Sequence, residues 1–170
     1  PLGIGVLTTA HKGGLASQEG MELAYRMMTT LNKGARDAMV KYRVHACTDV
    51  TGFALLGHLL EMSQGSEVQA VVNVDQVDMI EEALELAKMG VLPEGMYRNR
   101  SFAESSVDVG DTPLYKQDVL FDPQTAGGLL IAVDPGDADA LFAELRDCVP
   151  SAQRIGEIQS YQGGARILLR

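Results

Sequence analysis

The stretch Val44–Met62, VHACTDVTGFALLGHLLEM, passes from a strand to a helix through a short turn, and it decides the fold class. Val44–Thr48 is strand-like, and Asp49-Val50-Thr51-Gly52 is typical of a turn that leaves a strand. The segment Phe53–Met62 favours a helix, which we expect to end near Gly65 in a left-handed cap. A strand joined directly to a helix is the repeating unit of α/β proteins.

On both sides of this stretch the chain repeats the same alternation. Buried strands are predicted at Leu2–Thr9 and Gly127–Val133, and an apolar strand at Val68–Val74. Helices are predicted after a Ser17 cap, at Ala35–Tyr42, at Met79–Met89 with Gly90 as its stop, and from Asp134-Pro135 onward.

Two further segments complete the prediction. Ile155–Ile158 and Ala165–Leu169 flank Gln162-Gly163-Gly164, and this arrangement predicts a terminal hairpin. From Val91 to Gln117 no period emerges, so a long loop is predicted there. Taken together, the elements indicate one α/β layered domain over residues 1–170, with a mixed β-sheet and packing helices.

Composition narrows the class of protein. The chain has 170 residues, 46% of them hydrophobic, which is enough for a folded core and argues against intrinsic disorder. Two cysteines exclude a disulfide scaffold. The net charge of −9 repels phosphate backbones, so we expect no nucleic-acid partner.

The apolar stretch near Leu129–Val133 is far shorter than the ~20 residues of a membrane span, and no signal peptide is visible. We therefore expect a cytoplasmic protein with no membrane partner.

The turn after the predicted Val44–Thr48 strand is the most informative candidate site. A carboxylate at the carboxyl end of a strand lies where open α/β sheets bind ligands, and Asp49 occupies that position. Thr51 and Gly52 then open a helix whose free N–H groups favour an anion. Because Mg²⁺ takes one or two carboxylates and otherwise water or phosphate oxygens, Asp49 is a candidate magnesium ligand. The alternative is that Asp49 or Thr51 simply caps the helix.

A second candidate is Asp122-Pro123-Gln124-Thr125-Ala126-Gly127-Gly128. Its paired glycines permit close backbone approach, and Gln124 and Thr125 could donate hydrogen bonds to a nucleotide. The segment matches neither a P-loop nor a dinucleotide-binding fingerprint. A tight turn that leads into a buried strand is the alternative interpretation.

Histidine and cysteine give weaker signals. His11, His45 and His58 lack the spacing of metal ligands, and His58 is interpreted as a packed or capping residue. Cys47 would share a strand face with Asp49, but we interpret it as a buried structural cysteine. Cys148 forms no CxxC pair with it.

Three stretches together resemble the C-terminal half of the selenophosphate synthetases, also called selenide, water dikinases. They are PLGIGVLTTA at residues 1–10, HACTDVTGFALLGHLLEM at residues 45–62 and FDPQTAGGLL at residues 121–130, and they occur in the family's order along essentially the whole chain. The chain departs from the family at Ala54, commonly glycine, and at Ala126, commonly serine. These enzymes belong to the aminoimidazole-ribonucleotide-synthetase superfamily, whose C-terminal domain is a layered α/β fold.

The resemblance implies conversion of ATP, selenide and water to selenophosphate, AMP and phosphate, with Mg²⁺ as cofactor and ATP as substrate. Asp49 matches the family's C-terminal-domain metal ligand. The N-terminal ATP-binding domain, with its nucleophilic Cys or selenocysteine and its Lys, precedes this region in the family. We therefore expect residues 1–170 to be part of a longer, homodimeric enzyme, to contain no catalytic nucleophile, and to be inactive alone.

Two other classes of function remain open at this point. One is the C-terminal domain of a different ATP-dependent superfamily member, such as aminoimidazole ribonucleotide synthetase or a hydrogenase-maturation protein. The other is a regulatory or assembly domain that keeps the fold without the chemistry.

Overall fold

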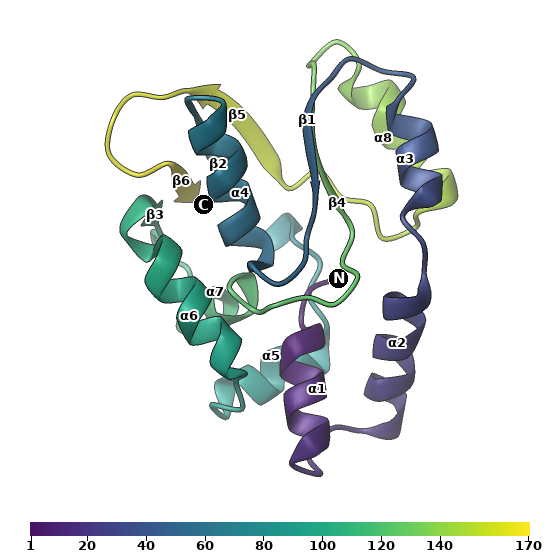
Figure 1. Ribbon diagram of the computed structural model, residues 1–170, viewed down its shortest axis with the longest axis vertical. Coiled ribbons are helices and arrows are strands. Elements are labelled where there is room, and N and C mark those ends of the chain that lie inside the picture. The colour runs from purple at the N-terminus through teal and green to yellow at the C-terminus, as the bar shows by residue number, and fades with distance from the viewer.

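The computed structural model describes residues 1–170, in which three helices precede the first strand and helices and strands are then interspersed along the chain (Figure 1). The helices are α1 (Ile4–Lys12), α2 (Gln18–Thr29), α3 (Lys33–Met39), α4 (Ala54–Gly65), α5 (Glu81–Lys88), α6 (Glu94–Ala103), α7 (Leu114–Leu120) and α8 (Ala138–Cys148), with short 3₁₀ turns η1 (Val74–Gln76) and η2 (Glu104–Ser106). The strands are β1 (Val44–Asp49), β2 (Val68–Val72), β3 (Val107–Asp108), β4 (Leu129–Val133), β5 (Gly156–Ser160) and β6 (Ile167–Leu169).

The strands form two separate sheets. The larger sheet has the order β3-β6-β2-β5, in which β2 runs parallel to β6 and antiparallel to β5. The predicted α/β fold with a mixed sheet and packing helices is therefore confirmed. The strands β1 and β4 pair only with each other, as an antiparallel ribbon next to α4 (Figure 1). The β4 side chains are half-buried, whereas the sequence pattern predicted a buried strand.

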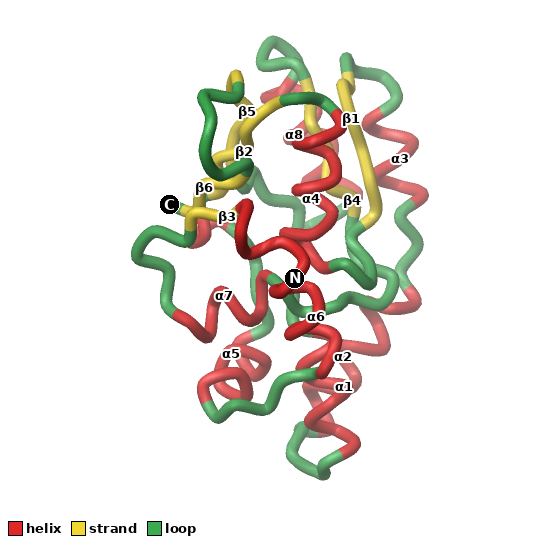
Figure 2. The backbone as a smooth tube through the Cα atoms, turned by 60° about the vertical axis from the view of Figure 1, so that its left-hand side comes forward, coloured by secondary structure: helices red, strands yellow, loops and turns green.

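Two hydrophobic cores hold these layers together. The first lies between α4, α6, α7 and the larger sheet, with Leu56, Phe121 and Ile167 almost fully buried. The second joins α1, α2 and α5, with Ile4 and Leu7 buried at its centre. Figure 2 shows these three helices gathered at the opposite end of the molecule from the four-stranded sheet.

The predicted strand at Leu2–Thr9 is wrong, because this segment forms helix α1. Leu2 alone is extended, as a bridge to Met79, and Gly3 then turns the chain with a φ of +123°. The first N–H groups of the helix are satisfied by side chains from residues 122 and 124, more than a hundred positions away. Local composition cannot reveal such a distant cap, and the glycine and β-branched content indicated a strand instead.

The predicted loop at Val91–Gln117 is also wrong. It contains α6, η2, the short strand β3 and the first half of α7. Pro93 and Pro113 interrupt the sequence pattern, but in the structure each stands immediately before a helix, as the N-cap of α6 and of α7. Proline is tolerated there because the N–H that it lacks has no intrahelical partner at a helix start.

The predicted terminal hairpin does not form either. Strands β5 and β6 lie on opposite sides of β2, so they share a neighbour instead of pairing with each other. The left-handed cap predicted at Gly65 is wrong too, since α4 includes Gly65 and the positive φ, +55°, falls at Glu67. In contrast, the predicted Ser17 cap of α2 is confirmed, with Ser17 Oγ accepting the Gly20 N–H at 2.9 Å.

Candidate functional site

Strand β1 presents Asp49 at its carboxyl end. Burial alternates along the strand, so that His45, Cys47 and Asp49 share the exposed face while the intervening side chains are half-buried. Asp49 lies opposite Leu129 of β4 in the ribbon register. The chain then turns, and α4 begins at Ala54. The structure thus places the predicted metal ligand at the surface, at the end of a strand.

The turn after Asp49 and the Gln124–Gly128 loop lie side by side, although more than 70 residues separate them in the sequence. The Val50 N–H donates to the Gly128 carbonyl at 2.9 Å, and the Gln124 N–H donates to the Thr51 carbonyl at 3.0 Å. A Cβ atom on Gly127 would lie 2.1 Å from the Val50 carbonyl oxygen, so this approach requires glycine. The turn after Asp49 and the Gln124–Gly128 loop therefore form one hydrogen-bonded unit.

Two asparagines that the sequence analysis did not single out support this unit. The buried Asn99 of α6 donates from Nδ2 to the carbonyls of Gly52 and Phe121, at 2.9 and 3.1 Å. Asn32 donates to the Gly127 carbonyl at 2.8 Å. Nothing in the local sequence marks either residue, because both act on main-chain groups far away in the chain.

Gln124 and Asp122 lie inside the molecule, at the start of α1. Gln124 is 4% exposed; its Oε1 accepts from the N–H groups of Gly3 and Ile4, at 3.3 Å each, and its Nε2 donates to Asp122. Asp122 Oδ2 accepts the Gly5 N–H at 2.9 Å. A nucleotide contact from Gln124 would require these bonds to break, so its visible role is to connect the Thr51 turn to helix α1.

Asp122 is fully buried, and its Oδ1 has no hydrogen-bond partner. Burial raises the pKa of this carboxyl to about 7, although hydrogen bonds from Gln124 and from the first N–H groups of α1 act in the opposite direction. Gly5 permits the close contact, since a Cβ there would lie 2.4 Å from Oδ1. The PLGIG and FDPQT segments are therefore complementary parts of one helix cap.

His58 lies in α4 and is 8% exposed, as expected for the predicted packed histidine. Its Nε2 is 3.0 Å from Thr51 Oγ1, and its Nδ1 is 3.2 Å from Glu61 Oε2. The Phe53 ring contacts the imidazole edge-on, with centroids 5.6 Å apart. The Thr51 hydroxyl is thus linked through the imidazole to a carboxylate, an arrangement that the sequence analysis did not identify.

Cys47 is exposed, so its interpretation as a buried structural cysteine is wrong. The error follows from the two-stranded ribbon, in which every second side chain of β1, including Cys47, is exposed. Desolvation of the sulfur, together with the nearby Asp49 charge, raises the pKa of the Cys47 thiol. A raised pKa means less of the nucleophilic thiolate at neutral pH, which agrees with leaving Cys47 out of the catalytic residues.

The donor groups at this site fit a shared magnesium ion but not a complete metal cage. The chain contains no cluster of three or more His, Cys, Asp or Glu side chains that could hold a metal ion. Mg²⁺, however, needs only one or two carboxylates when phosphate oxygens and water supply the remaining ligands. The exposed Asp49 can supply one such oxygen ligand, whereas the soft Cys47 sulfur beside it is unsuited to magnesium.

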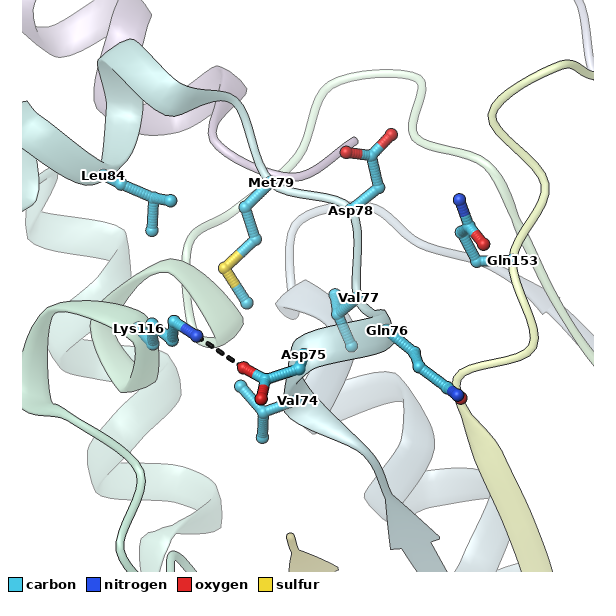
Figure 3. A pocket seen from close by; sticks show the side chains of 9 residues that line it. All are labelled: Val74, Asp75, Gln76, Val77, Asp78, Met79, Leu84, Lys116 and Gln153. Carbon is cyan, nitrogen blue, oxygen red and sulfur yellow. Dashed lines mark hydrogen bonds and ion pairs between the residues drawn. The ribbon is translucent and has the colours of Figure 1, made fainter.

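Thr51 and Gly52 lie in the turn itself, half-buried and exposed respectively, and Thr125 is exposed on the adjoining loop. A separate cavity of about 400 Å³ lies away from this turn, next to η1 and α7 (Figure 3). There Lys116 Nζ pairs with Asp75 Oδ1 at 2.7 Å. None of the predicted site residues lines this cavity.

The two departures from the family pattern both have left-handed backbone. Ala54 has a φ of +64° and Ala126 a φ of +50°. Left-handed backbone costs a non-glycine residue about 1–2 kcal/mol. We therefore expect Ala126→Gly, at an exposed position, to raise the free energy of unfolding by about 1 kcal/mol. Chemical denaturation measures this change.

The matched control is Ala143→Gly, at an exposed position within α8. There the backbone is helical, so glycine should lower the free energy of unfolding by about 1 kcal/mol. Equal destabilisation by both substitutions would contradict the strain assigned to Ala126.

Comparison with known proteins agrees with this architecture. Residues 1–168 match the family model described as AIR synthase related protein, C-terminal domain. Relatives named selenide, water dikinase occur in Treponema denticola, 47% identical over 145 residues, and in Pelobacter propionicus, 46% identical over 160 residues. They cover 85% and 93% of this chain, and the chain spans 41% and 46% of their length.

The fold also occurs among solved structures. The crystal structure of hydrogenase maturation protein HypE superimposes with a TM-score of 0.65 over 99% of this chain and 46% of HypE, at 19% sequence identity. At that identity the similarity concerns the fold alone. None of the helices has the length and apolar character needed to cross a membrane. With the family model matching nearly every residue, this chain belongs to the AIR synthase related proteins, as their C-terminal domain.

Proposed function

We propose that this chain is the C-terminal domain of a selenophosphate synthetase, the enzyme that converts ATP, selenide and water to selenophosphate, AMP and phosphate. The relatives named selenide, water dikinase support this assignment. The observation that carries it is the exposed Asp49 carboxylate at the end of β1, on a turn braced from the Gln124–Gly128 loop. Such a turn can present one carboxylate to a nucleotide bound by a second domain.

In this proposal a magnesium ion, when bound, neutralises negative charge on the phosphate oxygens. Asp49 supplies one oxygen ligand. Thr51 and Gly52 form the edge of the site at the start of α4, where free N–H groups favour an anion. Thr125 is exposed on the adjoining loop, and the Gln124 N–H donates a hydrogen bond to the Thr51 carbonyl.

The remaining parts of the proposed enzyme lie outside residues 1–170. An N-terminal domain would bind most of the ATP and supply the nucleophilic Cys or selenocysteine and the Lys. We propose a homodimer that acts in the cytoplasm, where ATP is available. Residues 1–170 alone are then expected to fold but not to turn over ATP.

The direct test is an assay of the full-length protein with ATP and Mg²⁺, with and without selenide under anaerobic conditions. Phosphorus NMR should detect selenophosphate, and AMP should accumulate in proportion to it. Residues 1–170 under the same conditions should give neither product. ATP turnover that is independent of selenide, or turnover by residues 1–170 alone, would contradict the proposed function.

A further inference from the structure

The imidazole of His58 is held on three sides at the base of the Asp49 turn. Side chains on a helix lean toward its N-terminus. His58, in the second turn of α4, therefore reaches back to Thr51, which lies in the loop before the helix. Glu61 contacts the opposite ring nitrogen from one turn further along the helix. The Phe53 ring packs edge-on against the imidazole. The imidazole therefore has one defined orientation.

The contacts at the two ring nitrogens favour one arrangement of the protons in a neutral imidazole. An ionised carboxylate only accepts hydrogen bonds, so the nitrogen that faces Glu61, Nδ1, must carry the proton. In a neutral imidazole Nε2 is then an acceptor, and it takes the hydroxyl proton of Thr51. In that tautomer the Thr51 hydroxyl donates its proton to His58.

We propose that His58, with its tautomer set by Glu61, is a positioning residue that locks the Thr51 hydroxyl and so holds the turn that presents Asp49. The inference rests on the proposed function, because it assigns the turn to magnesium binding. Three independent groups already fix the main chain of this turn, from Gly128, Gln124 and Asn99. His58 adds the one side-chain hydrogen bond of Thr51, and Thr51 lies two residues after Asp49.

Carboxylate partners that orient histidines near metal sites typically change metal affinity or activity about 10- to 100-fold when removed. The present arrangement differs in that the histidine acts on a hydroxyl in the turn and does not itself bind the metal. A histidine with a purely packing role would need neither a particular tautomer nor the Thr51 hydroxyl, and this difference can be measured.

The first experiment reads the tautomer in residues 1–170 labelled with ¹⁵N-histidine. Long-range ¹H–¹⁵N correlation spectra should show His58 protonated at Nδ1 and unprotonated at Nε2, and exposed His45 serves as the internal reference. Glu61→Gln, at an exposed side chain, should shift the balance toward the Nε2-protonated form. A wild-type His58 protonated at Nε2, or unchanged spectra in Glu61→Gln, would overturn the proposal.

The second experiment measures the Mg²⁺ requirement of the full-length protein. Thr51→Val keeps the β-branched shape but removes the hydroxyl, and it should raise the Mg²⁺ concentration for half-maximal rate about tenfold with little change in kcat at saturating Mg²⁺. Thr51→Ser keeps a hydroxyl at this position and should keep the wild-type Mg²⁺ requirement. His45→Asn, on the same strand as Asp49, should leave it unchanged.

Asp49→Asn helps to distinguish failure of the positioning role of His58 from failure of the proposed function. An inactive Asp49→Asn together with a normal Mg²⁺ requirement in Thr51→Val would overturn the positioning role and leave the proposed function standing. Full activity in Asp49→Asn would remove Asp49, and with it the positioning role, from the mechanism, whereas absence of selenide-dependent AMP formation in the wild-type full-length protein would overturn the proposed function itself. Thermal unfolding of every variant identifies any that fail to fold, and Glu61→Gln, altered at an exposed side chain, keeps the test available in that case.

Discussion

Asp49→Asn in the full-length protein should lower selenide-dependent AMP formation about 100-fold, because the amide keeps the shape of the side chain but removes its negative charge. The carboxylate lies exposed at the end of β1, so the substitution costs no buried interaction. Thermal unfolding should therefore be nearly unchanged while activity is lost. Initial rates of AMP formation at saturating ATP measure the effect.

The matched control is Asp147→Asn, an exposed carboxylate in the last turn of α8. It removes the same charge from the same acidic protein, so a general electrostatic effect would lower both activities equally. If Asp49→Asn retained near-normal AMP formation, Asp49 would have no part in the mechanism.

The second large effect concerns stability and pH. Burial raises the pKa of Asp122 from 3.8 to about 7. Between these values the folded chain binds one more proton at this site than the unfolded chain does, so the free energy of unfolding falls as pH rises. The expected loss from this residue is at most about 4 kcal/mol between pH 4 and 8.

Urea denaturation of wild type and Asp122→Asn at a series of pH values measures this contribution. The neutral amide cannot titrate, so wild type should lose stability relative to Asp122→Asn as pH rises through this range and then level off above the folded pKa. Asp147→Asn, at an exposed side chain of α8, is the control for removing a carboxylate outside the core. Parallel curves for wild type and Asp122→Asn would show that the buried carboxyl titrates normally.

The site could be predicted from the sequence in part. Asp49 at the end of a strand, followed by a turn and a helix, follows from local pattern, and the structure confirms those elements. The contact between this turn and the Gln124–Gly128 loop could not be predicted, because main-chain hydrogen bonds between distant segments leave no periodic signal. The same applies to Asn99, whose amide bonds two carbonyls in different parts of the chain.

The errors in the fold have two physical origins. Leu2–Thr9 has the composition of a strand, yet it forms α1 because Asp122 and Gln124 cap its N-terminus from across the molecule. Pro93 and Pro113 interrupt any period, yet each precedes a helix that packs in the first core. In α1 tertiary contacts outweigh local propensity, whereas at Pro93 and Pro113 the local signal is that of a helix start.

The most direct measurement is a crystal structure of the full-length protein with Mg²⁺ and a non-hydrolysable ATP analogue. An Asp49 carboxylate oxygen should lie about 2.1 Å from a magnesium ion that also binds phosphate oxygens. An Asp49 side chain directed away from the nucleotide, with every protein ligand of the metal drawn from elsewhere, would contradict it.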